Sequence, residues 1–209
     1  MPEVTLSLAV YDYLPMLIWG AGSYFLIDAI RKDINGGFFY YTLILSLGLV
    51  WIGGFLKATW KLLIAISDAN LILLSDMQFP LMGAGFCLLF ISLLAFLLQK
   101  KDIQKKNFAI GFFKKLFLPV MVIGSIGSTI CLIIIAKRRK VLPALIFYSI
   151  FLVVSTSMGF IGSRIVATSY KVIFIEQTIN CSSTLMWALG SFFLWKNHRA
   201  SSTFKSQHP

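Results

Sequence analysis

The sequence predicts an all-α fold, a polytopic bundle of about six transmembrane helices. Of its 209 residues, 58% are apolar and only 13% are charged, whereas a soluble domain is about 45–50% apolar and about 25% charged. A helical span needs roughly 20 apolar residues, and the chain contains six apolar runs of about this length. These observations exclude a soluble globular domain, a disordered chain and a collagen-like fibre.

The apolar runs predict the helices in chain order. They cover Tyr13 to Ile27, Phe38 to Leu56, Phe79 to Leu98, Leu116 to Ala136, Val141 to Ser163 and Val172 to Trp195. None alternates like the strands of a lipid-spanning barrel, and only a helix satisfies its own backbone within such a run. The second run continues past two lysines to Ile66, so this helix is either long and tilted or broken at the glycine pair 53–54.

One connection is longer than the others and divides the chain into halves. Residues 99–115 carry six lysines around a short apolar patch, which predicts an interfacial helix on anionic lipid or, equally, a solvated basic loop. The predicted organisation is a first three-helix repeat over residues 1–98, this basic interfacial linker over 99–115, a second three-helix repeat over 116–195, and a disordered tail over 196–209.

A weak internal repeat relates the two halves. Leu14-Pro15 followed by Gly20 matches Leu118-Pro119 followed by Gly124. Few identities support the match, so coincidence between similar apolar helices is the alternative. Because each half has an odd number of helices, a true duplication predicts a 3+3 inverted repeat, as in many transporters.

Basic residues leave the orientation in the membrane open. In the six-helix arrangement, Arg31, Lys32 and the linker lysines lie on one side, while the run 137–140 and the basic residues of the tail lie on the other. This division is nearly even, so the positive-inside rule does not decide. We favour the linker side as cytoplasmic because its charge is densest, which places the run 137–140 outside.

Several kinds of chemistry have no residues to support them. The only histidines, His198 and His208, lie in the polar tail, and the three cysteines are spread over separate runs. We therefore expect no cofactor and no metal site. No nucleotide-binding or hydrolase motif is present, so an enzyme is disfavoured. The net charge of +11 comes from cations that flank membrane helices, and we expect no nucleic-acid partner.

Polar side chains at membrane depth are the candidate site, because they are costly there unless they have a function. Lys57 and Lys61 share a helix face beside Trp60 and suit either lipid headgroups or an anionic ligand. Arg164 ends the fifth run, and Asp12 is interpreted as a helix cap. The candidate substrate or pathway residues are Lys57, Trp60, Lys61, Asp76, Gln78, Arg164, Glu176, Gln177 and Asn180.

The sharpest feature is a polar stripe in the last run. Glu176, Asn180, Ser183 and Thr184 recur at the spacing of one helical face, with Gln177 beside them. Such a stripe either packs helices together through hydrogen bonds or lines a cavity. If the repeat is real, Lys57 and Gln78 in the first half correspond to Arg164 and Gln177 in the second, and a site forms at the repeat interface.

Three functions agree with these features. The first is a small integral membrane transporter or channel for a small polar or ionic solute. The second is a non-catalytic membrane subunit or assembly factor, and the third is an intramembrane lipid-modifying enzyme. The expected partners are the lipid bilayer, anionic lipid at the linker, and a second copy of the chain or a partner subunit.

Overall fold

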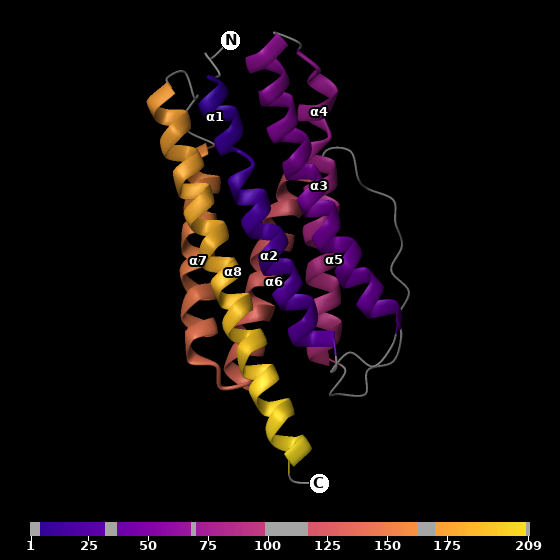
Figure 1. Ribbon diagram of the computed structural model, residues 1–209. Coiled ribbons are helices and arrows are strands. Elements are labelled where there is room, and N and C mark those ends of the chain that lie inside the picture. Colours follow the sequence, from indigo (N-terminus) through magenta and orange to yellow (C-terminus); the bar gives the residue numbers. More distant parts are fainter. Residues whose placement is uncertain (1–4, 32–36, 68–69, 99–116, 163–169, 208–209) are drawn as a thin grey trace.

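The computed structural model describes residues 5–31, 37–67, 70–98, 117–162 and 170–207, and it is a bundle of long helices (Figure 1). The described part contains helices and turns and no strand, as the uniformly apolar runs predict. Its helices are α1 (Leu6–Tyr11), α2 (Leu14–Arg31), α3 (Gly37–Ser67), α4 (Ile72–Asp76), α5 (Gln78–Leu98), α6 (Phe117–Arg138), α7 (Leu142–Gly162) and α8 (Tyr170–Gln207).

Three helical segments of the described chain are long and apolar enough to cross a membrane. They are Leu6–Arg31, which combines α1 and α2, Gly37–Ser67, and Ile72–Leu98, which combines α4 and α5. The shortest has 26 residues, which corresponds to about 39 Å of helix and exceeds a hydrocarbon core of about 30 Å. A shorter apolar helix covers Leu142–Ser157. These helices support the prediction of a membrane protein.

Helix α3 is one continuous helix of 31 residues, so the alternative of a break at the glycine pair is wrong. Both glycines are buried where other helices approach. A Cβ at Gly53 would lie 2.8 Å from Met82 of α5, and one at Gly54 would overlap Met16 of α2. The glycines therefore allow close helix packing, the common use of small residues in membrane proteins.

The last helix also differs from the expectation. α8 runs from Tyr170 to Gln207, so the tail expected to be disordered from residue 196 is helical as far as Gln207. Trp195 anchors α8 to α2 just before residue 196, because its indole donates a 2.7 Å hydrogen bond to the carboxylate of Asp28. Arg199, one turn further, also faces this carboxylate at 3.6 Å.

Helices α5 and α6 run parallel, and the inverted repeat is not confirmed. On α5 and α6, a Cβ at Gly124 would lie 2.9 Å from the backbone of Cys87, and Arg138 donates to the carbonyl of Leu97 at 3.2 Å. The residue numbers increase together along both helices, so α5 and α6 point the same way. A 3+3 inverted repeat would place these two helices antiparallel, so their pairing does not support it.

Basic residues gather at one end of the bundle, where α2, α5 and α6 terminate (Figure 1). Arg139 reaches from the end of α6 to the carbonyl of Ala29 at 2.9 Å, which fixes the ends of α2 and α6 side by side. We call this end the basic end; its exposed cations are Arg31, Lys137, Arg138, Lys140, Lys196 and Arg199. Arg31 and the run 137–140, which the predicted six-helix arrangement places on opposite sides, therefore lie at the same end.

A tryptophan pair joins α2 and α8 in the core. Trp19 and Trp187 stack with ring centroids 4.0 Å apart, and the Trp19 indole donates to the carbonyl of Leu47 on α3 at 3.3 Å. Gly22 lies against the same ring, since a Cβ there would be 2.5 Å from Trp187. This packing holds α2, α3 and α8 together directly beside the candidate site.

Candidate functional site

A cavity of about 230 Å³ lies among the helices. Its walls come from α2, α3, α5, α6, α7 and α8, together with the turn between α1 and α2. Apolar side chains, among them Trp19, Phe86 and Phe151, form part of the lining. The polar lining residues are Asp12, Lys57, Gln78, Ser125, Ser155, Gln177, Asn180, Ser183 and Thr184.

Helical spacing explains why these residues meet. On α8, Gln177, Asn180 and Thr184 follow i, i+3 and i+7 and share one face, on which Gln177 and Thr184 are buried and Asn180 is exposed. On α3, Gly54, Lys57 and Ala58 lie on one face in the same way. The lining positions lie early in α2, α5 and α8 and late in α3. The cavity therefore occupies the half of the bundle that is distant from the basic end.

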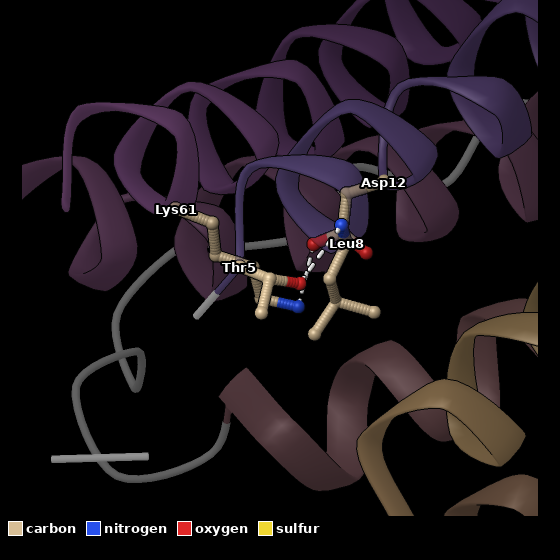
Figure 2. A network of polar contacts seen from close by, with 4 residues as sticks. All are labelled: Thr5, Leu8, Asp12 and Lys61. Carbon is tan, nitrogen blue, oxygen red and sulfur yellow. Dashed lines mark hydrogen bonds and ion pairs between the residues drawn. The ribbon is translucent and has the colours of Figure 1, made fainter. Parts of the chain in front are cut away.

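A buried ion pair forms one wall region. The carboxylate Oδ2 of Asp12 lies 2.5 Å from Nζ of Lys61, and these side chains are only 4% and 10% exposed (Figure 2). α1 leads directly into this pair, because Asp12 is its C-cap residue. At the other end of α1, Thr5 caps the first turn by accepting from the N–H of Leu8 at 3.4 Å. The pairing compensates two charges that would otherwise be buried alone.

The other carboxylate oxygen of Asp12 has no hydrogen-bond partner in the described structure, although it is buried. A carboxylate oxygen can accept more than one hydrogen bond, and a buried acceptor without a donor costs free energy. Asp12 is also one of the residues that line the cavity.

Lys57 is the cation that lines the cavity, in addition to the Lys61 that pairs with Asp12. It is half-buried one turn before Lys61 and lines the cavity. Among the residues that the structure describes, its ammonium makes no ion pair within 4.0 Å and no hydrogen bond. Asp12 and Glu176 are close enough to interact with it electrostatically, as is Lys61. The three donors of Lys57 are thus open to a molecule in the cavity.

Amides complete the polar lining. Gln177 is only 5% exposed, yet its side chain makes no hydrogen bond to any described residue. Gln78 makes only a weak 3.5 Å contact with the sulfur of Met82. An amide can donate and accept at once, so these groups can bind either polar end of a small molecule.

The structure brings together some of the predicted site residues and leaves others apart. Lys57, Gln78, Gln177 and Asn180 line the cavity. Lys61 adjoins it through its ion pair with Asp12, and Glu176 is half-buried near Lys57.

The remaining predicted residues contribute nothing to the cavity wall that the structure describes. Trp60 donates to Oδ1 of Asn70 at 3.0 Å in an exposed position. Asp76 is exposed at the end of α4. Arg164 lies outside the described residues.

Sequence reasoning missed Asp12 as a site residue and interpreted it as a cap of the first membrane helix. In the structure it follows the short α1 and pairs with Lys61. The signal was a lone carboxylate near two lysines that lacked counter-charges. Ser125 and Ser155 were also missed, because an isolated hydroxyl in an apolar helix usually bonds its own backbone. Ser155 does so, donating to the carbonyl of Leu152 at 3.3 Å.

The arrangement suits binding of a solute with charged and hydrogen-bonding groups. The described residues contain no group of three or more histidine, cysteine, aspartate or glutamate side chains that could hold a metal ion. Comparison of the chain with protein-family models, with curated proteins and with solved structures finds no match.

Proposed function

We propose that the protein is a small multi-pass membrane transporter or channel that binds a polar or ionic solute in the cavity among these helices. The observation that carries this proposal is the convergence of polar side chains from several helices on one cavity among helices that are otherwise apolar. Charged and amide groups at membrane depth are costly, and they typically line a substrate or ion pathway.

The membrane arrangement follows from the same cavity. α2, α3 and α5 belong to segments long enough to cross a bilayer, and α6, α7 and α8 share the cavity with them. We therefore propose that Leu6–Arg31, Gly37–Ser67 and Ile72–Leu98 cross the bilayer and that α6, α7 and α8 pack against them around the cavity. By the positive-inside rule the basic end is cytoplasmic, and the cavity then lies toward the opposite face, from which the solute enters.

Helix packing is the alternative role for the polar stripe of α8. Polar groups that serve packing form hydrogen bonds between helices, as Tyr148 and Ser191 do at 3.0 Å between α7 and α8. Gln177 makes no such bond within the described structure and faces the cavity. This difference favours solute binding over packing for Gln177.

The test is transport by the purified protein in proteoliposomes. A panel of inorganic ions, organic acids, amines and amino acids is screened by radiolabelled uptake and by electrical recording on a solid-supported membrane. Gln177→Leu should abolish the flux that the wild-type protein shows, because the amide is lost from the cavity. It should leave the melting temperature in detergent unchanged or raised, because the amide makes no hydrogen bond to a described residue and an apolar group of similar size replaces it.

The matched control is Asp76→Asn, which changes an exposed carboxylate outside the cavity wall and should transport like the wild type. The proposal is overturned if no member of the panel is moved by wild-type protein, or if Gln177→Leu transports normally. A large loss of melting temperature in Gln177→Leu would instead support the packing role and a non-catalytic membrane subunit.

A further inference from the structure

We infer that the solute is a small zwitterion of the amino-acid class, with its cationic group on Asp12 and its anionic group on Lys57. The inference rests on the proposed function and deepens it, because it names the substrate class of the same cavity. It depends on the unused hydrogen-bonding groups of the buried Asp12 and the half-buried Lys57, on the charge balance of the cavity and on its volume.

The first step is the cationic end of the solute. Oδ2 of Asp12 is occupied by Lys61, whereas Oδ1 is buried without a partner in the described structure. An ammonium group can donate to Oδ1 without displacing Lys61. This side of the cavity therefore suits a primary or secondary ammonium.

The second step is the anionic end. Lys57 lines the cavity and has no carboxylate within 4.0 Å among the described residues. A carboxylate of the solute would accept its donors in charge-assisted hydrogen bonds. The amides of Gln177 and Asn180 line the same cavity and can donate to the same carboxylate. This side of the cavity therefore suits a carboxylate.

The third step is charge balance. The charges that interact around the cavity are the carboxylates Asp12 and Glu176 and the ammoniums Lys57 and Lys61. Their formal charges cancel. A solute with a net charge would leave one charge uncompensated in a region of low dielectric, where this is costly. A zwitterion keeps the sum at zero and still satisfies one group of each sign.

The fourth step is size. The cavity holds about 230 Å³, below the range of about 300–1,000 Å³ that is usual for pockets of drug-sized ligands. A molecule with the dimensions of a small amino acid fits this volume. The hydroxyls and amides of the lining favour a polar side chain, so L-serine is the first probe.

The experiment measures binding of L-serine to the purified full-length protein in nanodiscs by isothermal titration calorimetry. L-serine methyl ester retains only the cationic group, and N-acetyl-L-serine retains only the anionic group. Each analogue should bind on the order of tenfold or more weakly than L-serine, because each loses one charge-assisted contact. These comparisons use the wild-type protein, so they do not depend on whether any variant folds.

A variant assigns the two ends of the solute. Lys57→Gln leaves the Asp12–Lys61 pair intact and should weaken L-serine by a similar factor, while the binding of the methyl ester should change little. Asp76→Asn is the matched control and should bind L-serine like the wild type. Equal binding of L-serine by wild type and Lys57→Gln would overturn the assignment of the anionic end to Lys57.

The possible failures are distinguishable. If N-acetyl-L-serine or the methyl ester binds as tightly as L-serine, or if the transport screen identifies a simple anion or cation as the solute, the zwitterion inference is overturned while the proposed function stands. If L-serine and the other amino acids of the panel do not bind but another solute is moved, the inference again falls alone. If no solute binds or moves, the proposed function fails and the inference with it.

Discussion

The carboxylate of Asp12 lies 2.5 Å from the ammonium of Lys61, and both side chains are at least nine-tenths buried. This contact ties the turn between α1 and α2 to the late part of α3. It also explains how two lysines one turn apart are tolerated in an apolar helix. Lys61 has a counter-charge in the protein, whereas Lys57 faces the cavity.

Breaking this pair should destabilise the fold. Lys61→Met leaves the buried carboxylate of Asp12 without its counter-charge, so unfolding in detergent should become easier by about 3–5 kcal/mol, as for other buried pairs that lose one partner. The measurement is reversible unfolding followed by tryptophan fluorescence. The double variant Asp12→Asn, Lys61→Met should recover most of the loss. Equal stability of the single variant and the wild type would show that the pair does not stabilise the fold.

Gly22 should be intolerant of even a methyl group. A Cβ at this position would lie 2.5 Å from the Trp187 ring and 2.8 Å from the backbone of Ala188, and the rigid backbone contact cannot move aside cheaply. Gly22→Ala should therefore destabilise the protein by about 1–3 kcal/mol through overpacking, measured as thermal melting.

Gly48 provides the matched control on α3, because a Cβ there meets nothing within 4 Å. Gly48→Ala should be neutral or stabilising by up to about 1 kcal/mol through helix propensity. If both alanine variants melt alike, the close approach of α2 and α8 at Gly22 is not as the structure shows it.

Lys140 occupies a backbone conformation that favours glycine. Its φ is 58°, and it ends α6 in a Schellman motif: its N–H bonds the carbonyl of Lys137 at 3.1 Å, and the N–H of Val141 bonds that of Ala136 at 3.0 Å. A residue with a Cβ in the left-handed conformation costs roughly 1–2 kcal/mol, so Lys140→Gly should stabilise the protein. Part of this gain is offset because glycine has more conformational entropy in the unfolded chain, which leaves a net stabilisation of about 0.5–1 kcal/mol.

The comparison for Lys140→Gly is Lys137→Gly, in the last turn of α6. There the backbone is helical and glycine should destabilise by up to about 1 kcal/mol. Thermal melting of the two variants should therefore shift in opposite directions. A lower melting temperature for Lys140→Gly would contradict the motif.

The basic end should be accessible from one side of the membrane. Arg31 and Lys137 are exposed at this end, and Asn70 is exposed beyond the far end of α3. With the native cysteines replaced, single cysteines at Arg31→Cys and Lys137→Cys should react with a membrane-impermeant thiol reagent from the same side. Asn70→Cys should react from the opposite side. Labelling of the first two from opposite sides would restore the inverted repeat.

The class of the fold was predictable from sequence, because a run of about 20 apolar residues has few alternatives to a membrane helix. Lys57, Gln177 and Asn180 could also be singled out by sequence alone. Polar side chains in such runs are conspicuous, and helical periodicity shows which of them share a face. The ends of the helices were less well predicted, as α8 shows by continuing to Gln207.

The tertiary structure decided what those side chains meet. The parallel pairing of α5 with α6 is a long-range packing choice, and no local pattern states it. Its contacts depend on small residues such as Gly124, which lets the backbone of Cys87 approach. That pairing places Arg31 and Lys137 at one end, and the turn after α1 brings Asp12 to Lys61. Sequence determines which groups need partners, and only the packing of distant helices determines which partners they find.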